Sequence, residues 1–236
     1  MNQLQEALRG VAATQELKEW TRRRLVRERT RRRSAGRKGL AAAVCACLLC
    51  LLLGAGGYRF YMSPVSYISI DVNPSLELGL NAFDRVVQTV AYNDGGGEIA
   101  ARLSLQNMPY QQAVDEVLSD QVFQSYAAQG NGVVFTVVSG DGARLQAGLE
   151  GCSGYYASGG HSYLADARCL DEAHTNGLSV GKYRAYLELS EYDPSVTVDD
   201  CHHMSMGELQ QRLEQCHEGA QSTQGHGHGE HRHGHS

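Results

Sequence analysis

An Asn–Pro dipeptide is the feature of this sequence with the clearest capacity for chemistry. It is Asn73–Pro74, inside the run DVNPS that also holds Asp71 and Ser75. The side-chain nitrogen of an asparagine can attack a neighbouring carbonyl carbon. When the next residue has a backbone N–H, that nitrogen usually attacks the side chain instead, but proline has none. The main five-membered-ring route left is attack by Asn73 on its own carbonyl, which breaks the chain before Pro74 and leaves a succinimide.

Such a reaction needs a turn that holds the asparagine in place. A tight turn between paired strands would supply this proximity. Asp71 and Ser75 are the nearest candidates for moving a proton or polarising the carbonyl. An Asn–Pro dipeptide alone is also a common turn starter, and Asp193–Pro194 is interpreted only as a turn.

An apolar segment of eighteen residues precedes this motif. Leu40 to Gly57 carries no charge and has about the minimum length that crosses a hydrocarbon core of roughly 30 Å. Arginines are concentrated before the segment and only Arg59 follows closely, so the positive-inside bias places Met1 in the cytoplasm. A cleaved signal peptide is the alternative. Cys45, Cys47 and Cys50 inside the segment are expected to pack as ordinary apolar side chains.

Charge divides the chain at this segment. Residues 1–39 have a net charge of +8, whereas the remaining residues have a net charge of −13. This asymmetry excludes one uniform globular enzyme and indicates two compartments or two kinds of partner.

The basic arm, residues 1–39, is too short and too polar to form a stable core alone. Its apolar side chains follow two helical stripes, which predicts a pair of short helices or one helix with a break near Thr14. We expect these stripes to dock into a groove on a cytosolic protein. The basic run at 22–33 could instead bind anionic lipid or DNA, and lipid is the default close to a membrane. The predicted partner-binding residues are Leu4, Leu8, Val11, Leu17 and Trp20.

After Ser63 the pattern becomes that of an α/β domain. Alternating apolar residues predict strands at 68–72, 76–80 and 86–90, and a continuous apolar run predicts a buried strand at 133–138. Helical spacing predicts helices at 110–126, 164–175, 180–191 and 205–216.

Four cysteines lie in this outer region, where an even number permits two disulfides in one of three connectivities. Sequential pairing is the expectation, and reduced thiols or a weak zinc set with nearby histidines are the alternatives. The disulfide candidates are Cys152, Cys169, Cys201 and Cys216.

The last eleven residues hold five histidines among glycines and charges, so they are expected to be disordered. Neutral imidazoles could bind Zn, Ni or Cu ions weakly, although a solvated tail is the simpler interpretation. The candidate metal ligands are His226, His228, His231, His233 and His235. No cofactor is expected.

The stretch VSYISIDVNPSLELGLNAFDRVVQ, residues 65–88, resembles the extracytoplasmic domain of RsgI-type membrane anti-sigma factors of Gram-positive bacteria. Residues 177–201, GLSVGKYRAYLELSEYDPSVTVDDC, look like the C-terminal part of the same domain. The resemblance implies a single transmembrane helix between a short helical cytoplasmic arm that sequesters an alternative sigma factor and an outer αβα-sandwich-like domain. The resemblance also implies that this domain cuts itself between Asn73 and Pro74 and that its pieces stay associated.

The resemblance further implies that removal of the outer piece exposes the membrane stub to an intramembrane protease. The self-cleavage has no turnover, so the chain is not expected to be an enzyme. Besides the sigma factor and the protease, membrane lipid is an expected partner and direct contact with nucleic acid is not. The N-terminus would be cytoplasmic and the C-terminus extracellular.

One other class of function competes with signalling. An extracytoplasmic module that binds a metal or a cell-wall ligand, anchored by the arm and span, would use the same layout. The sequence lacks G-x-S-x-G and H-E-x-x-H patterns, so nothing favours a secreted hydrolase.

The predicted organisation has five parts. They are the arm 1–39, the transmembrane helix 40–57, the outer core 58–139, its C-terminal helical part 140–218, and the tail 219–236.

Overall fold

The computed structural model describes residues 14–128 and 132–224, and the chain divides into two units at Tyr58. The first unit contains most of one long helix, α2 (Gln15–Tyr61), which begins after Thr14 as the sequence predicts. The carbonyl of Thr14 accepts hydrogen bonds from the amides of Leu17 and Lys18. The helix that the sequence predicts before Thr14 lies outside the described residues.

Within α2, Ala43–Tyr61 is long and apolar enough to cross a membrane, judged by length and composition. This span overlaps the predicted segment 40–57 and extends further toward the outer domain. Leu17 and Trp20 of the predicted partner-binding set are exposed on α2, whereas Leu4, Leu8 and Val11 lie outside the described residues.

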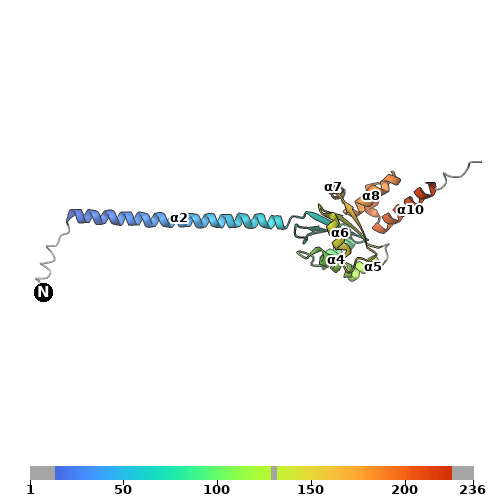
Figure 1. Cartoon of the computed structure of the whole chain (residues 1–236), viewed down its shortest axis with the longest axis horizontal. Coiled ribbons are helices and arrows are strands. Elements are labelled where there is room, and N and C mark those ends of the chain that lie inside the picture. Colours follow the sequence, from blue (N-terminus) through green and yellow to red (C-terminus); the bar gives the residue numbers. More distant parts are fainter. Residues whose placement is uncertain (1–13, 129–131, 225–236) are drawn as a thin grey trace, which may run out of the picture. The chain divides into compact units, whose positions relative to one another are not determined.

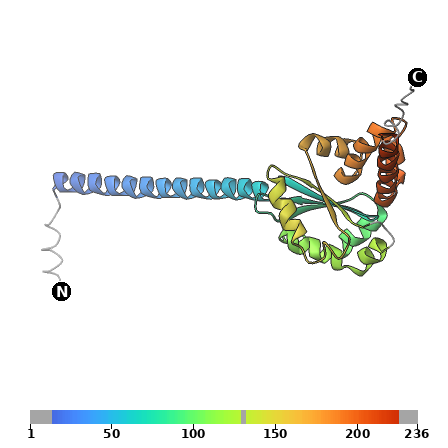
Figure 2. The same cartoon turned by 45° about the vertical axis from the view of Figure 1, so that its right-hand side comes forward.

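The second unit is built on a five-stranded sheet (Figures 1 and 2). The strands are β1 (Ser66–Asp71), β2 (Ser75–Leu80), β3 (Val86–Ala91), β4 (Val134–Val138) and β5 (His161–Ala165). Their spatial order is β3-β2-β1-β4-β5, and every pair is antiparallel except β4 with β5. The first strand is therefore central, with β2 on one side and β4 on the other.

Helices cover both faces of this sheet, as Figure 2 shows for the green helices on one side and the orange and red helices on the other. Strand residues alternate between the faces. Ile68 and Ile70 face the larger hydrophobic cluster, with α3 (Asp94–Arg102), α4 (Tyr110–Ser119), α5 (Gln121–Ala127) and α6 (Gly142–Glu150). Val134 and Val138 face the second cluster, with α7 (Ala167–Thr175), α8 (Val180–Tyr192), α9 (Val198–His203) and α10 (Met206–Gln224). The predicted mixed α/β class is confirmed.

The helix that the sequence predicts at 110–126 is two helices. Asp120 has an extended backbone, and its carboxylate accepts hydrogen bonds from the amides of Val122 and Phe123. An aspartate that caps a second helix ends the first one, and apolar periodicity does not register such a local break. The segment predicted as the C-terminal helical part, 140–218, also contributes β5 to the sheet.

The four outer cysteines are all free thiols in the structure. Cys152 belongs to the larger hydrophobic cluster, whereas Cys169 and Cys201 belong to the cluster on the other face of the sheet. The sheet therefore separates Cys152 from Cys169, and the sequentially paired disulfides are not formed here.

Candidate functional site

The Asn–Pro dipeptide lies in the three-residue loop that joins the central strand β1 to β2. Asp71 and Ser75 pair across the base of this hairpin. The amide of Val72 donates to the carbonyl of Pro74 at 3.0 Å, and the carbonyl of Val72 accepts from the amide of Met206 at 3.1 Å. Asn73 is exposed and Pro74 is buried. The predicted turn between paired strands is present, and the first residue of α10 holds it from outside.

At the base of the loop, the carboxylate of Asp71 is fully buried on the sheet face under α8. The hydroxyls of Ser69 and Ser75 donate hydrogen bonds to it. A third hydroxyl, that of Ser179, donates at 2.6 Å. A buried carboxylate is costly unless it is hydrogen-bonded, and these three donors offset that cost.

Ser179 and the first turn of α8 are placed for this contact. The Ser179 hydroxyl also accepts from the amide of Lys182, so this residue caps the helix. A Cβ atom at Gly181 would lie 2.1 Å from the Asp71 carboxylate, so only glycine permits this approach. Lys182 is buried as well, and its ammonium donates to the carbonyl of Met204 at 2.6 Å.

Burial and charge act in opposite directions on these two groups. Burial raises the pKa of Asp71, while the three hydroxyls and the Lys182 charge lower it less strongly. Burial lowers the pKa of Lys182, while Asp71 raises it. Both shifts disfavour the charged forms of Asp71 and Lys182, and shifted pKa values of this kind are frequent at functional sites.

A second buried carboxylate lies on the same face of the sheet. Glu77 of β2 pairs with Ser69 and lies 2.7 Å from Nε2 of His174 on α7. Burial raises the pKa of Glu77, and His174 opposes that shift. The other oxygen of Glu77 has no hydrogen-bond partner among the described residues. The face under α7 and α8 is therefore polar at its centre.

Asn93 is a site residue that sequence analysis missed. It precedes α3, and its side-chain oxygen accepts from the amides of Gly96 at 2.9 Å and Ser75 at 3.1 Å. Its side-chain nitrogen donates to the side-chain oxygen of Asn73 at 2.8 Å. An Asn-Asp-Gly run two residues after a predicted strand is a helix-start signal that could have placed Asn93 near a strand end.

Ser179 was also missed, although Ser-Val-Gly before a helical pattern is the same kind of signal. Of the predicted site residues, the structure brings Asp71, Asn73, Pro74 and Ser75 together at one hairpin end. The candidate metal ligands of the tail lie outside the described residues. Within residues 14–128 and 132–224, no group of three or more His, Cys, Asp or Glu side chains could hold a metal ion.

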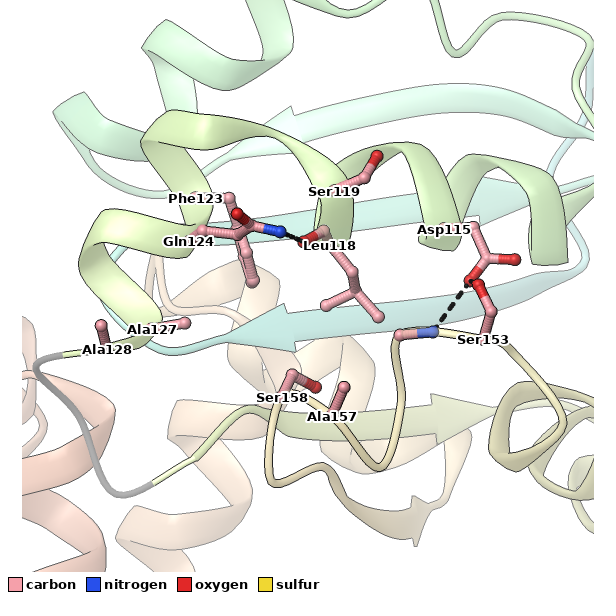
Figure 3. Close-up of a pocket in the computed structure, with 11 residues that line it drawn as sticks. Asp115, Leu118, Ser119, Phe123, Gln124, Ala127, Ala128, Ser153, Ala157 and Ser158 are labelled. Atoms are coloured by element: carbon pink, nitrogen blue, oxygen red, sulfur yellow. Dashed lines mark hydrogen bonds between the residues drawn. The ribbon is translucent and has the colours of Figure 1, made fainter.

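A pocket of about 380 Å³ lies between α4–α5 and the loop at 153–158 (Figure 3). Its polar side chains are paired with the protein itself. Asp115 accepts from the hydroxyl of Ser153 and the amide of Gly154, and Gln124 donates to the carbonyl of Leu118. The pocket contains no residue of the Asn–Pro loop.

The family follows from a comparison of the whole domain. Residues 65–188 match the family model described as the anti-sigma factor RsgI-like central domain, which is more than half of the chain. This chain belongs to the RsgI-type anti-sigma factors. The matched region contains the Asn–Pro hairpin, Asn93 and the start of α8, so the site described above belongs to the family domain.

Individual relatives agree with this assignment. The anti-sigma-I factor RsgI7 of Acetivibrio thermocellus is 25% identical over 173 residues, which is 67% of this chain and 31% of that protein. The anti-sigma-I factor RsgI9 of the same organism is 24% identical over 169 residues, 64% of this chain and 24% of that protein. The anti-sigma-I factor RsgI of Bacillus anthracis is 30% identical over 106 residues, 43% of this chain and 23% of that protein. This RsgI-type chain thus spans about a quarter to a third of the length of these relatives.

Proposed function

We propose that this chain is a single-pass membrane anti-sigma factor that holds an alternative sigma factor in the cytoplasm and releases it after a signal outside the cell. Membership of the RsgI-type family supports the anti-sigma role. The apolar stretch Ala43–Tyr61 supports a membrane anchor, and the positive charge before it favours a cytoplasmic N-terminus. The unit from Arg59 onward would then lie outside the cell.

We further propose that the outer unit cuts itself between Asn73 and Pro74. The observation that carries this proposal is the hairpin itself, which holds the Asn–Pro bond in a three-residue loop whose base includes a buried carboxylate. The side-chain nitrogen of Asn73 forms a bond to its own carbonyl carbon, and the bond from that carbon to the nitrogen of Pro74 breaks. One proton leaves the Asn73 side chain and one arrives on the Pro74 nitrogen. Asp71 is the group at the base of the loop that can relay this proton.

Cleavage at this bond would leave β1 on the membrane-anchored piece and all later strands on the outer piece. Because β1 is the central strand, the two pieces would remain paired until a signal separates them. The exposed stub would then be a substrate for an intramembrane protease, and its basic residues would contact anionic lipid.

The full chain purified in detergent is expected to consist of two pieces that meet at Asn73 and Pro74. Immediately after cleavage, the N-terminal piece should be one water lighter than the free carboxylic acid, because it ends in a succinimide. Intact mass measurement and a denaturing gel test this, beside Asn73→Ala, which should remain one piece. Asp193→Asn is the matched control, because it creates a second Asn–Pro bond at the C-terminal end of α8. That bond should stay whole; an uncut parent chain would remove the release mechanism.

Sigma-factor binding is expected to depend on the apolar stripes of the arm. Replacing Leu8, Val11, Leu17 and Trp20 with Asp should abolish co-purification of a sigma factor while leaving membrane insertion intact, because charge on this surface prevents docking into an apolar groove. Arg22→Asp, on the side of α2 opposite Leu17 and Trp20, is the control and should retain binding. Co-purification that survives the fourfold substitution would contradict groove docking. A chain that never captures a sigma factor would instead favour an anchored binding module.

A further inference from the structure

The hydrogen bonds of Asn93 fix which way the side chain of Asn73 faces. An asparagine side chain has one oxygen, which accepts, and one nitrogen, which donates. The amides of Gly96 and Ser75 both point at one end of the Asn93 side chain. Backbone amides can only donate, so that end is the oxygen and the other end is the nitrogen.

The same argument fixes the orientation of the Asn73 side chain. The nitrogen of Asn93 lies 2.8 Å from the side chain of Asn73 and must meet an acceptor, which is the oxygen of that side chain. The nitrogen of Asn73 is consequently the end turned away from Asn93. The orientation of the exposed Asn73 therefore follows from two buried backbone amides, although nothing in its own sequence position fixes it.

We infer that Asn93 is the positioning residue for self-cleavage, which directs the side-chain nitrogen of Asn73 to the reaction. This inference rests on the proposed self-cleavage. The nitrogen of Asn73 must lose a proton as it attacks, and the negative charge that develops is shared with the oxygen of the same amide. A donor already aimed at that oxygen stabilises this charge without reorganising. An inverted Asn73 side chain would present oxygen in place of nitrogen and could not form the succinimide.

The fold holds Asn93 firmly enough for this role. It caps α3, and it contacts the loop on both sides of the scissile bond, at Asn73 and at Ser75. The adjoining amide of Tyr92 donates to the carbonyl of Ser75 at 3.0 Å. A Cβ atom at Gly96 would lie 2.3 Å from that carbonyl oxygen, so the glycine allows the start of α3 to reach the loop.

Asn93→Asp separates positioning from folding. The introduced carboxylate keeps an acceptor for the amides of Ser75 and Gly96, and Asp caps helices as well as Asn does. Its second oxygen can only accept, so it would draw the nitrogen of Asn73 toward itself. We expect self-cleavage of the full chain at neutral pH to slow by at least about tenfold, with little change in thermal unfolding.

The pH profile of the rate identifies the cause. The amides of Ser75 and Gly96 hold the pKa of the introduced carboxyl below its ordinary value of about 4. Below that lowered pKa the group is protonated and regains a donor for the oxygen of Asn73. The ratio of the variant rate to the parent rate should therefore rise as the pH falls, and a purely structural defect would not produce this rise. Asn176→Asp, an exposed substitution at the end of α7 that adds the same charge, is the control and should follow the parent.

The outcomes separate the two proposals. A parent chain that never cuts itself overturns the self-cleavage proposal and this inference with it. A parent that cuts, beside an Asn93→Asp variant that cuts equally fast, overturns only the role of Asn93. A slow variant with a constant rate ratio across pH also overturns positioning, because the defect is then structural.

Discussion

Replacing Asp71 with Asn is expected to slow cleavage of the Asn73–Pro74 bond by about 100-fold or more, the usual contribution of a group that transfers a proton. The amide has nearly the same shape as the carboxylate but cannot take up a proton in the relevant pH range. Asp71 lies at the base of the scissile loop and accepts from three hydroxyls. These donors hold the carboxylate in one orientation, so the substitution removes a group that is already positioned before the reaction.

The same substitution is not expected to lower stability at neutral pH. Burial holds the pKa of Asp71 above its ordinary value of 3.8, so the folded state binds this proton more tightly than the unfolded state does. Stability that depends on this group is therefore highest in acid and is lost as the pH rises from the unfolded pKa through the raised folded pKa. An amide does not ionise, so the Asp71→Asn chain does not lose stability at this position as the pH rises. The pKa of Glu77 is raised as well, so the dependence of stability on pH that Glu77 causes remains in the variant.

Both effects can be measured with the parent as reference. Cleavage of the Asp71→Asn chain is followed by intact mass over time. Stability is compared in two uncut chains, Asn73→Ala with and without Asp71→Asn, by urea unfolding between about pH 4 and about pH 7. The exposed Asp171→Asn on α7 serves as a control for loss of one negative charge. Cleavage of Asp71→Asn at the parent rate would show that Asp71 only supports the fold.

The sequence carried enough information to predict the hairpin but not the chemistry around it. Two short alternating runs joined by Asn–Pro predict adjacent strands, and β1 and β2 are these strands. The same alternation places Ser69 and Asp71 on one face and Ile68 and Ile70 on the other. A polar row within a strand is normally solvent-exposed, so the alternation alone does not predict that α8 covers this face.

The missed residues act over long distances along the chain. Ser179 reaches Asp71 across 108 positions, and Asn93 reaches Asn73 across 20. Their local signal is that of a helix cap, which many serines and asparagines share. Only the packing of α3 and α8 against the sheet distinguishes these two from ordinary caps, and such packing leaves no periodic signal. Strand β5 was missed for a related reason, because its residues are mostly exposed or half-buried and lack a clear apolar period.

The position of β1 in the sheet determines how the two pieces would be held together after the proposed cleavage. The anchored piece would contribute this single strand to the sheet, paired at six positions with β2 and at five with β4. Ile68 and Ile70 are fully buried in the larger hydrophobic cluster. Separation of the pieces would therefore require the loss of a central strand together with its core contacts, and the free energy of these contacts sets the threshold for separation.

Replacing Ile70 with Ala is expected to lower this threshold. Removing a buried isoleucine side chain beyond Cβ costs about 2–5 kcal/mol of folding free energy, part of it from the cavity that remains. In the uncut Asn73→Ala background, urea unfolding should show this loss. In the cut chain the same free energy should weaken association of the pieces by at least about 25-fold, since 1.4 kcal/mol corresponds to tenfold.

The matched control lies on the same piece, immediately before the strand. Val65 is 56% exposed, so Val65→Ala should change stability by less than about 0.5 kcal/mol. Washing membranes that carry the cut chain with increasing urea reports the concentration at which the outer piece leaves. Ile70→Ala should release it at a clearly lower concentration than the parent or Val65→Ala does. Equal release in all three would mean that β1 is not what joins the pieces, and that the signal acts on a different contact.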